Sequence, residues 1–310
     1  MSKTSSPQGD NKSQASPTKE ERGVVEQYLL PFINVGSRFP LFPGKNNEDV
    51  VAQLLGWTRE EVAQAYANVE ENTRQAALEL LKEDEIVDMI DSLPFDGEEV
   101  IGVLGDSISL DAQGWVYILK HLLDMSNEDA NFTFINASQT QDTTTDALRR
   151  IDQDLLVHKP DWVFVALGSF DAQRLSIYPD RTLIPLSDTW ENIQAIQDIL
   201  EHEVSNPPVW ISPAPIMSEL LEEHALYTFS IHPQDLAAVQ DVVTGKTGGI
   251  VDPKSNRMGE QPQAWHYIPD GLHHSLTGHM QTVREVLKTL VEINQKGHAN
   301  QLNPEDYSEE

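Results

Sequence analysis

A serine that follows an apolar segment is the first residue in this sequence that could do chemistry. Gly105-Asp106-Ser107 comes directly after the apolar run 100–104. A strand there would hold the serine rigidly while the loop leaves its hydroxyl exposed, which is what a nucleophile requires. The same triplet is also typical of a turn before a helix. Ser107 is therefore a candidate nucleophile, and it needs a base.

An aspartate and a histidine near the other end of the chain could supply that base. In Asp270-Gly271-Leu272-His273 the two side chains are three residues apart, within reach of one another in a single turn. The carboxylate could accept the imidazole Nδ1 proton and leave Nε2 facing a nucleophile. The alternative is that Asp270 caps a helix that begins near Thr277.

Five apolar runs separated by helical patterns define the elements that must position these residues. Short runs of this kind are typical of strands that are buried on both faces of a parallel sheet. Strands that alternate with helices predict an open α/β sandwich, in which ligands bind beyond the carboxyl ends of the strands. The expected strands are 100–104, 132–135, 162–167, 209–211 and 249–251, and the expected helices are 115–123, 143–156, 189–200, 217–226 and 277–293.

Two further loops rich in small polar residues follow the second and third expected strands. They are Asn136 to Thr144 and Gly168-Ser169-Phe170-Asp171. In a parallel sheet these loops would converge with Ser107 and His273 on one crevice. This convergence weighs more than any single motif.

The chain divides into four predicted parts. The first is a disordered tail, because residues 1–20 contain almost nothing to bury. A helical extension over 21–95 includes a helix that ends at Gly56 and another that begins with the capping box Thr58 and Glu61. The α/β domain spans 96–297, and an acidic tail spans 298–310.

Composition excludes several classes of function. The 310 residues contain 50 acidic and 21 basic side chains, a net charge of −29, so nucleic acid and anionic membrane surfaces are disfavoured partners. Cysteine is absent, which excludes disulfides and thiolate chemistry. We find no apolar segment typical of a signal peptide or membrane span, and expect a cytoplasmic protein. The acidity could reflect solubility or adaptation to high salt.

The ordered motifs GDS, NAS…DTT, GSFD and DGLH resemble the sequence blocks of the SGNH/GDSL hydrolases, over roughly residues 98–295. These are serine esterases, lipases and carbohydrate O-deacetylases with a flavodoxin-like fold. The resemblance implies a three-layer αβα sandwich around a five-stranded parallel sheet. It also implies Ser107 as nucleophile, His273 as general base and Asp270 as its orienting carboxylate, with the Ser107 N–H binding the oxyanion.

Two positions depart from the family pattern. Ser138 stands where we place the family's oxyanion-hole glycine, and its backbone N–H remains a candidate donor. Phe170 stands where the family has an asparagine amide, so one donor is missing. Such a loss typically lowers turnover about 100- to 1000-fold. Gln139, Ser169, Gln173 or a water molecule could substitute for it.

Other polar residues have competing interpretations. We expect Asp106, Asn136, Phe170 and Asp171 to line the substrate pocket. Asp106 and Asp171 could also be read as a glycosidase pair, but the fold pattern and Ser107 favour structural or hydrogen-bonding roles.

Three further patterns could indicate a metal site, a nucleotide site or a lid. His273, His274 and His279 with Asp270 could suggest a metal site, but Asp270 and His273 already have a role. Gly245-Lys246-Thr247 resembles the end of a phosphate-binding loop but lacks its upstream glycine, so nucleotide binding is rejected. The Gly- and Pro-rich segment 244–268 could form a lid or pack the Asp-His turn.

The sequence therefore predicts a serine ester hydrolase that acts on a small-molecule ester through an acyl-enzyme on Ser107, without a metal or organic cofactor. Two alternatives remain. One is a noncatalytic ligand-binding or scaffolding protein in which Phe170 fills the oxyanion pocket. The other is assembly through the N-terminal helices. A homo-oligomer is left open.

Overall fold

The computed structural model describes residues 18–33, 35, 48–127, 129–225, 227–252 and 263–302. Most of the predicted N-terminal tail therefore lies outside the described residues, as do the centre of the predicted lid segment and residues 303–310.

Five parallel strands form the central sheet, in the order β2-β1-β3-β5-β7. The strands are β1 (Val100–Gly105), β2 (Thr133–Asn136), β3 (Trp162–Ala166), β5 (Val209–Ile211) and β7 (Gly249–Val251). Each coincides with one predicted apolar run to within one residue at either end. The predicted α/β class with a five-stranded parallel sheet and flanking helices is confirmed.

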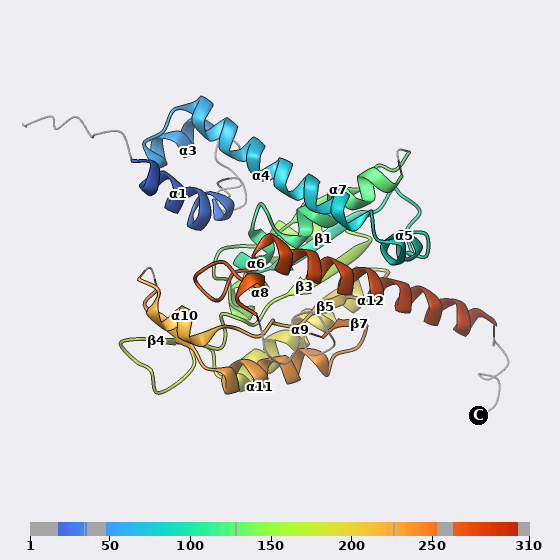
Figure 1. Ribbon diagram of the computed structural model, residues 1–310. Helices are drawn as coiled ribbons and strands as arrows, with labels where there is room; N and C mark the ends of the chain where they lie inside the picture. Colours follow the sequence, from blue (N-terminus) through green and yellow to red (C-terminus); the bar gives the residue numbers. More distant parts are fainter. Residues whose placement is uncertain are drawn as a thin grey trace, which may run out of the picture.

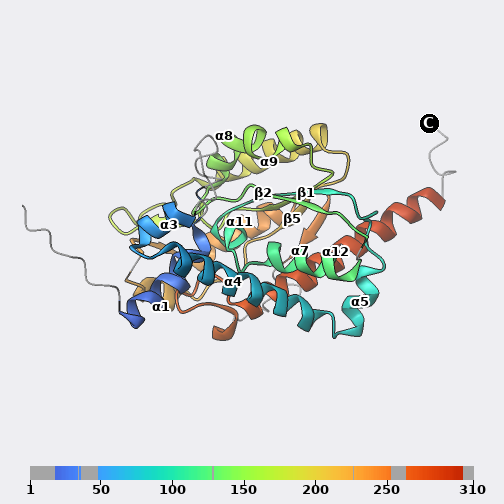
Figure 2. The ribbon, with the colours of Figure 1, turned by 90° about the horizontal axis from the view of Figure 1, so that it is seen from above.

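Helices cover both faces of the sheet and create three layers (Figure 1, Figure 2). One layer contains α8 (Thr144–Asp154), α9 (Leu186–Glu203) and α11 (Pro233–Thr244); the other contains α7 (Trp115–Ser126), α12 (Leu276–Leu302) and α4 (Arg59–Leu80). Successive residues of a strand point to opposite faces. In β3, Val163 and Val165 therefore join the first core, and Trp162 and Phe164 join the second.

The N-terminal helices share a core with the sheet. They are α1 (Lys19–Tyr28), the 3₁₀ turn η1 (Leu30–Phe32), α3 (Glu48–Leu55), α4 and α5 (Asp84–Ile90). The Thr58 and Glu61 capping box starts α4 as predicted, and Gly56 adopts φ +70° after α3. Because Ala76, Leu80 and Ile86 pack in the core beside β1 and β3, α4 continues into the sandwich. The boundary at 95/96 stays a prediction.

Several elements were not predicted from the sequence. β4 (Gln173–Leu175) pairs antiparallel with β6 (Phe229–Ile231) outside the main sheet. α10 (Ser218–Glu223) is shorter than expected, and η4 (Ala264–His266) precedes the Asp-His turn. The two strands of the small sheet have three residues each, too few for periodicity to reveal them. α11 could have been found, because Leu236, Val239 and Val243 are buried at helical spacing.

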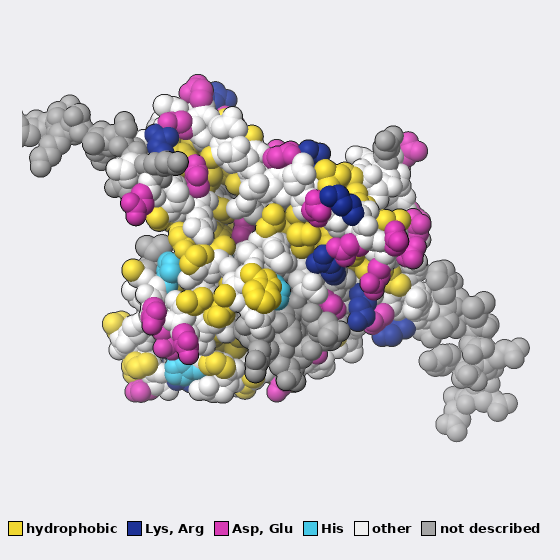
Figure 3. All heavy atoms as spheres, viewed as in Figure 1, with side chains coloured by type: hydrophobic (Ala, Val, Ile, Leu, Met, Phe, Trp, Pro, Cys, Tyr) yellow, Lys and Arg dark blue, Asp and Glu magenta, His cyan; other side chains and the backbone are white. Residues whose placement is uncertain are grey.

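The surface mixes both signs of charge. On the face in Figure 3, acidic side chains are scattered, and basic ones lie beside several of them. One ion pair, Arg284 with Glu83, links α12 to the start of α5. Over the part of the chain that the structure describes, no helix combines the length and the apolar character that crossing a bilayer requires.

Candidate active site

Ser107 lies at the carboxyl end of β1 as the first residue of α6 (Ser107–Leu110), the short helix marked in Figure 1. Asp106 caps this helix by accepting a hydrogen bond from the Ile108 N–H at 3.0 Å. The serine is held between a buried strand and a helical turn, but it is only 1% exposed. The predicted rigid placement is present, and the exposure predicted for its hydroxyl is not.

Asp270 and His273 form a buried pair in the turn before α12. The Nδ1 of His273 lies 2.7 Å from Asp270 Oδ2, and the Leu272 and His273 N–H groups each donate to Asp270 Oδ1 at 2.9 Å. Burial by itself raises the pKa of Asp270, but the hydrogen bonds and charge of His273 and these N–H groups outweigh it and lower the pKa. Asp270 therefore orients the imidazole instead of capping the next helix.

Gly271 makes this turn possible. Its φ of +71° lies in the left-handed region, and a Cβ there would approach the Met217 carbonyl oxygen to 2.5 Å. The Met217 N–H also donates to the Gly271 carbonyl at 2.8 Å, which fixes the turn against the start of α10.

Ser107 and His273 are not joined by a hydrogen bond. Ser107 Oγ accepts from the Gln141 N–H at 3.4 Å. The Nε2 of His273 is buried and has no hydrogen-bond partner among the described residues. The imidazole thus presents an unsatisfied nitrogen within the covered site.

The loop after β2 places Gln141, not Ser138, against the serine. The Ser138 N–H donates to Asn136 Oδ1 at 3.1 Å, and the Asn136 amide donates in turn to the Ser109 carbonyl at 2.8 Å. Gln141 adopts φ +59°, which turns its N–H toward Ser107 Oγ. Sequence reasoning missed Gln141 because this conformation favours glycine and asparagine, and glutamine gives no signal for it.

Arg150 holds the two loops together from α8. Its guanidinium donates to Asp142, to the Ala137 carbonyl and to the Gly105 carbonyl, and so joins the carboxyl ends of β1 and β2. Only 16% of the side chain is exposed. The sequence analysis did not single out this residue.

Phe170 lies in the hydrophobic core. The side chain is fully buried and packs against Phe229 with ring centroids 6.1 Å apart, within the cluster that includes Leu272. The substituted position therefore contributes packing, and it offers no hydrogen-bond donor.

Asp171 is a structural carboxylate. It accepts from the Thr144 N–H at 2.9 Å and from the Thr189 hydroxyl at 3.0 Å, and so ties α8 to α9. Burial raises its pKa, and these hydrogen bonds oppose the shift. Both carboxylate oxygens are occupied. Oδ1 accepts from the Thr144 and Thr189 hydroxyls, and Oδ2 accepts from the Thr144 N–H.

Asp106 faces a small void behind Ser107. The void has a volume of about 20 Å³ and is lined by Ser109, Ser169 and His274 among others. Burial raises the pKa of Asp106 to about 7, although the Ile108 N–H and the charge of His273 oppose the shift.

The candidate substitute donors are partly occupied. The Gln139 N–H donates to the Gly105 carbonyl at 3.1 Å. Ser169 shares the void with Asp106, and the Gln173 N–H in β4 donates to the Phe170 carbonyl at 3.4 Å.

The histidines do not assemble a metal site. Within the described ranges, no group of three His, Asp or Glu side chains could hold an ion. His279 Nε2 lies 3.3 Å from Asp111 Oδ2, away from the Asp270 pair, and the His274 ring packs on Tyr267 and His279.

The N-terminal segment covers the site. The Phe32 ring packs on the His273 imidazole with centroids 4.6 Å apart. The Pro31 carbonyl accepts from the Ala112 N–H at 2.9 Å, and the Phe32 carbonyl accepts from the Thr140 hydroxyl at 3.3 Å. η1 is thus tied to the segment that follows α6 and to the loop after β2, and its Phe32 ring covers the His273 imidazole.

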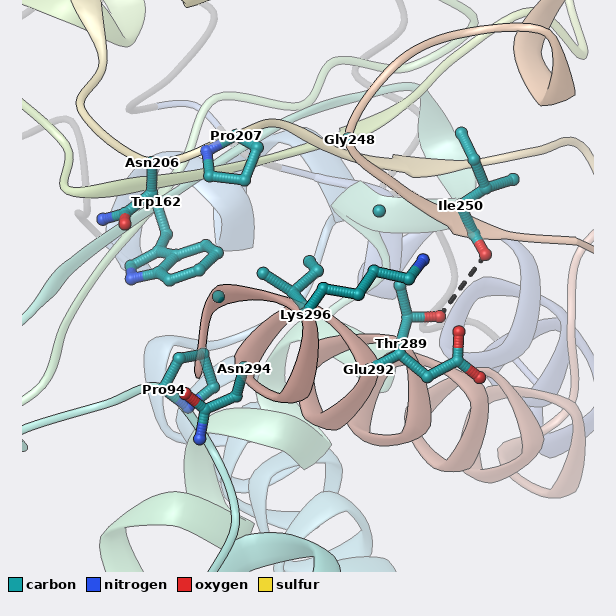
Figure 4. A pocket seen from close by; sticks show the side chains of 13 residues that line it. Pro94, Trp162, Asn206, Pro207, Gly248, Ile250, Thr289, Glu292, Asn294 and Lys296 are labelled. Atoms are coloured by element: carbon teal, nitrogen blue, oxygen red, sulfur yellow. Dashed lines mark hydrogen bonds between the residues drawn. The ribbon is translucent and has the colours of Figure 1, made fainter. Parts of the chain in front are cut away.

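Two larger cavities lie elsewhere. One of about 470 Å³ is lined by η1, α3, α4, α6 and α7, with Tyr66, Leu110 and Tyr117 among its lining residues. The other, of about 560 Å³, lies at the amino ends of β3, β5 and β7, with Trp162 and Lys296 of α12 in its wall (Figure 4). Neither is lined by Ser107, Asp270 or His273.

Comparison with known proteins identifies similar folds. The sequence matches no protein-family model and no curated protein. A lipase/acylhydrolase from Enterococcus faecalis is similar in structure, with a TM-score of 0.50, 22% identity, and coverage of 64% of this chain and 96% of that one. This likeness shows a shared fold.

Two further solved structures have lower scores. An alpha/beta hydrolase enzyme from the metagenome of Lake Arreo has a TM-score of 0.49 and 17% identity, covering 62% of this chain and 94% of that one. An acetylxylan esterase from Geobacillus stearothermophilus has a TM-score of 0.46 and 18% identity, with the same coverage.

Proposed function

We propose that this chain is a serine ester hydrolase that uses Ser107, His273 and Asp270. The observation that carries the proposal is the buried Asp270–His273 hydrogen bond of 2.7 Å, which leaves Nε2 of the imidazole unsatisfied beneath the same sheet edge as Ser107. Most buried polar atoms in proteins have a hydrogen-bond partner, so an imidazole nitrogen without one supports a role in accepting a proton during the reaction. The substrate class named for the Enterococcus faecalis lipase/acylhydrolase, whose fold the chain shares, supports an ester.

The reaction proceeds through an acyl-enzyme. Ser107 Oγ attacks the ester carbonyl while His273 Nε2 takes the hydroxyl proton. The tetrahedral intermediate collapses, the C–O bond to the alcohol breaks, and His273 gives its proton to the leaving oxygen. Water then attacks the acyl-enzyme with His273 as base, which releases the acid and restores Ser107. Asp270 holds the tautomer and stabilises the imidazolium throughout.

Backbone N–H groups bind the oxyanion in this proposal. The N–H of Ser107 is at the first position of α6 and has no intrahelical acceptor. The N–H of Gln141 already points at Ser107 Oγ, so a small shift would direct it at the oxygen that becomes negative. Ser138 remains the donor expected from the sequence, but the hydrogen bond from its N–H to Asn136 Oδ1 would first have to break.

A noncatalytic binding protein is the second candidate. The missing hydrogen bond between Ser107 and His273 and the Phe32 ring over the imidazole favour it. Both functions use the same site, and they differ in whether Ser107 is activated as a nucleophile.

Labelling with a fluorophosphonate, followed by intact-mass measurement, tests the proposal. We expect one adduct on the wild type, and none on Ser107→Ala or His273→Ala under the same conditions. Ser187→Ala is the matched control, because Ser187 is an exposed serine whose hydroxyl donates to Asp188. An unlabelled but folded wild type would overturn the hydrolase and favour the binding protein.

A further inference from the structure

Tyr227, in the segment between α10 and β6, reaches the proposed catalytic pair from outside its turn. Its hydroxyl donates to Asp270 Oδ2 at 2.9 Å and lies 3.3 Å from His273 Nδ1. Oδ2 therefore accepts hydrogen bonds from both the imidazole and the phenol, while Oδ1 accepts hydrogen bonds from the Leu272 and His273 N–H groups. Four donors surround one carboxylate, and one of them comes from 43 residues away in the sequence.

Aromatic packing fixes the phenol in place. The Tyr227 ring packs against His224 at 5.0 Å and against Phe229 at 5.1 Å between centroids, and Tyr28 of α1 packs on His224 at 5.1 Å. A side chain held by rings on two sides has few rotamers to sample. Its hydroxyl is therefore preorganised toward Asp270.

The phenol of Tyr227 stays a neutral hydrogen-bond donor over the whole pH range in which a histidine can act as a base. Burial and then the negative charge of Asp270 raise the pKa of Tyr227 far above its ordinary value. The proton consequently stays on the phenol oxygen, and the hydrogen bond to the carboxylate persists.

Resting on the proposed function, we propose that Tyr227 is a positioning residue that holds the Asp270 carboxylate for His273 and withdraws part of its negative charge. A carboxylate that accepts a second strong hydrogen bond attracts the imidazolium less. Such a base releases its proton more readily to the leaving alcohol. The phenol thus sets how strongly the imidazole is protonated, without touching the ester.

Other titratable groups of the described residues bear on this pair. Asp106 at the start of α6 interacts with the charge of His273, Tyr28 at the end of α1 interacts with the charge of Asp270, and His224 packs on the Tyr227 ring. Phe32 of η1, which covers the imidazole, carries no charge. Substitution of Tyr227 leaves these groups in place, so a changed pH profile reports on the phenol.

The test is the rate of fluorophosphonate labelling as a function of pH in Tyr227→Phe. Loss of the donor leaves more charge on Oδ2 and favours the protonated imidazole, so the acidic midpoint of the profile should move upward by about half a unit to one unit. The plateau rate should fall about 3- to 10-fold, the equivalent of one typical net hydrogen bond, because the carboxylate loses a contact that positions it. Tyr178→Phe, at an exposed tyrosine, is the matched control and should leave both unchanged.

Replacing Tyr227 by meta-fluorotyrosine provides a second, nearly isosteric variant in case Tyr227→Phe does not fold. Its more acidic phenol is a stronger donor, so the midpoint should move downward. A merely structural tyrosine would give neither shift.

The outcomes separate the two proposals. A wild type that does not label overturns the hydrolase itself. A wild type that labels, with the same midpoint in the folded Tyr227 variants, overturns only the role of Tyr227. Opposite shifts in the two variants support it.

Discussion

The two edges of the central sheet differ in what they do with polar groups. At the carboxyl edge, Ser107, Asp270 and His273 are buried, the Phe32 ring of η1 packs on His273, and Nε2 of His273 has no partner among the described residues. At the amino edge there is an open cavity of about 560 Å³, a space large enough for a ligand. The larger space and the candidate chemistry thus lie at opposite ends of the same strands.

Polar side chains at the amino edge are used to bind backbone. Asn206 donates to the Asp161 carbonyl at 2.9 Å, Asn294 to the Ser92 carbonyl at 3.1 Å, and Thr289 to the Ile250 carbonyl at 3.4 Å, the last drawn as a dashed line in Figure 4. These contacts stabilise loops and the packing of α12. The comparison shows that the larger cavity and the proposed catalytic residues lie at different edges, so the volume of a cavity does not by itself support the proposed site.

The same carboxylate-to-amide change at both edges tests most directly which edge carries the chemistry. Asp270→Asn should lower the rate of fluorophosphonate labelling about 1000- to 10,000-fold, because the amide can hold the imidazole in the wrong tautomer. Glu292→Gln, in the wall of the amino-edge cavity, should leave the rate unchanged. Equal effects would show that the site has been assigned to the wrong edge.

A smaller effect is expected from uncovering the carboxyl edge. Phe32→Ala removes the ring that packs on His273, and the labelling rate should rise about 2- to 10-fold, the equilibrium equivalent of one lost aromatic contact. Phe32→Leu, which keeps much of the apolar bulk, should give a smaller rise. A lower rate in the folded alanine variant would mean that Phe32 orients the imidazole instead of blocking it.

The last prediction concerns the stability of the fold and not the labelling rate. Burial raises the pKa of Asp106 to about 7, so between about pH 4 and pH 7 the folded chain holds a proton that the unfolded chain has lost. The free energy of unfolding therefore decreases as the pH rises through this window, by up to about 1.4 kcal/mol per pH unit. Asp106→Asn keeps the helix cap and should flatten this slope in denaturant titrations. An unchanged slope would place the titration elsewhere.

Much of the fold could be predicted because its signals are local. Short apolar runs buried on both faces indicate parallel strands, and each of the five was located to within one residue. The capping box at Thr58 and Glu61 needs only four neighbouring residues, so it too could be read directly. The small β4–β6 sheet could not, because three-residue strands carry no periodicity.

The candidate site divides in the same way. The aspartate and histidine are three residues apart, so a single turn suffices to bring them together, as it does at 2.7 Å. The resemblance to the family pattern predicted that Phe170 lacks an amide donor, but it did not predict that the ring lies in the hydrophobic core. Nor could the sequence reveal the left-handed conformation of Gln141, which depends on the loop that Arg150 holds.

By itself, then, the sequence determined the positions of the five central strands, the α/β class and the pairing of Asp270 with His273, because each depends on residues close together in the chain. Only the tertiary structure decided that Phe32 covers His273, that Tyr227 shares the carboxylate and that Gln141 faces Ser107. These contacts join segments distant in sequence. They arise from the packing of the whole chain, which periodicity and spacing do not encode.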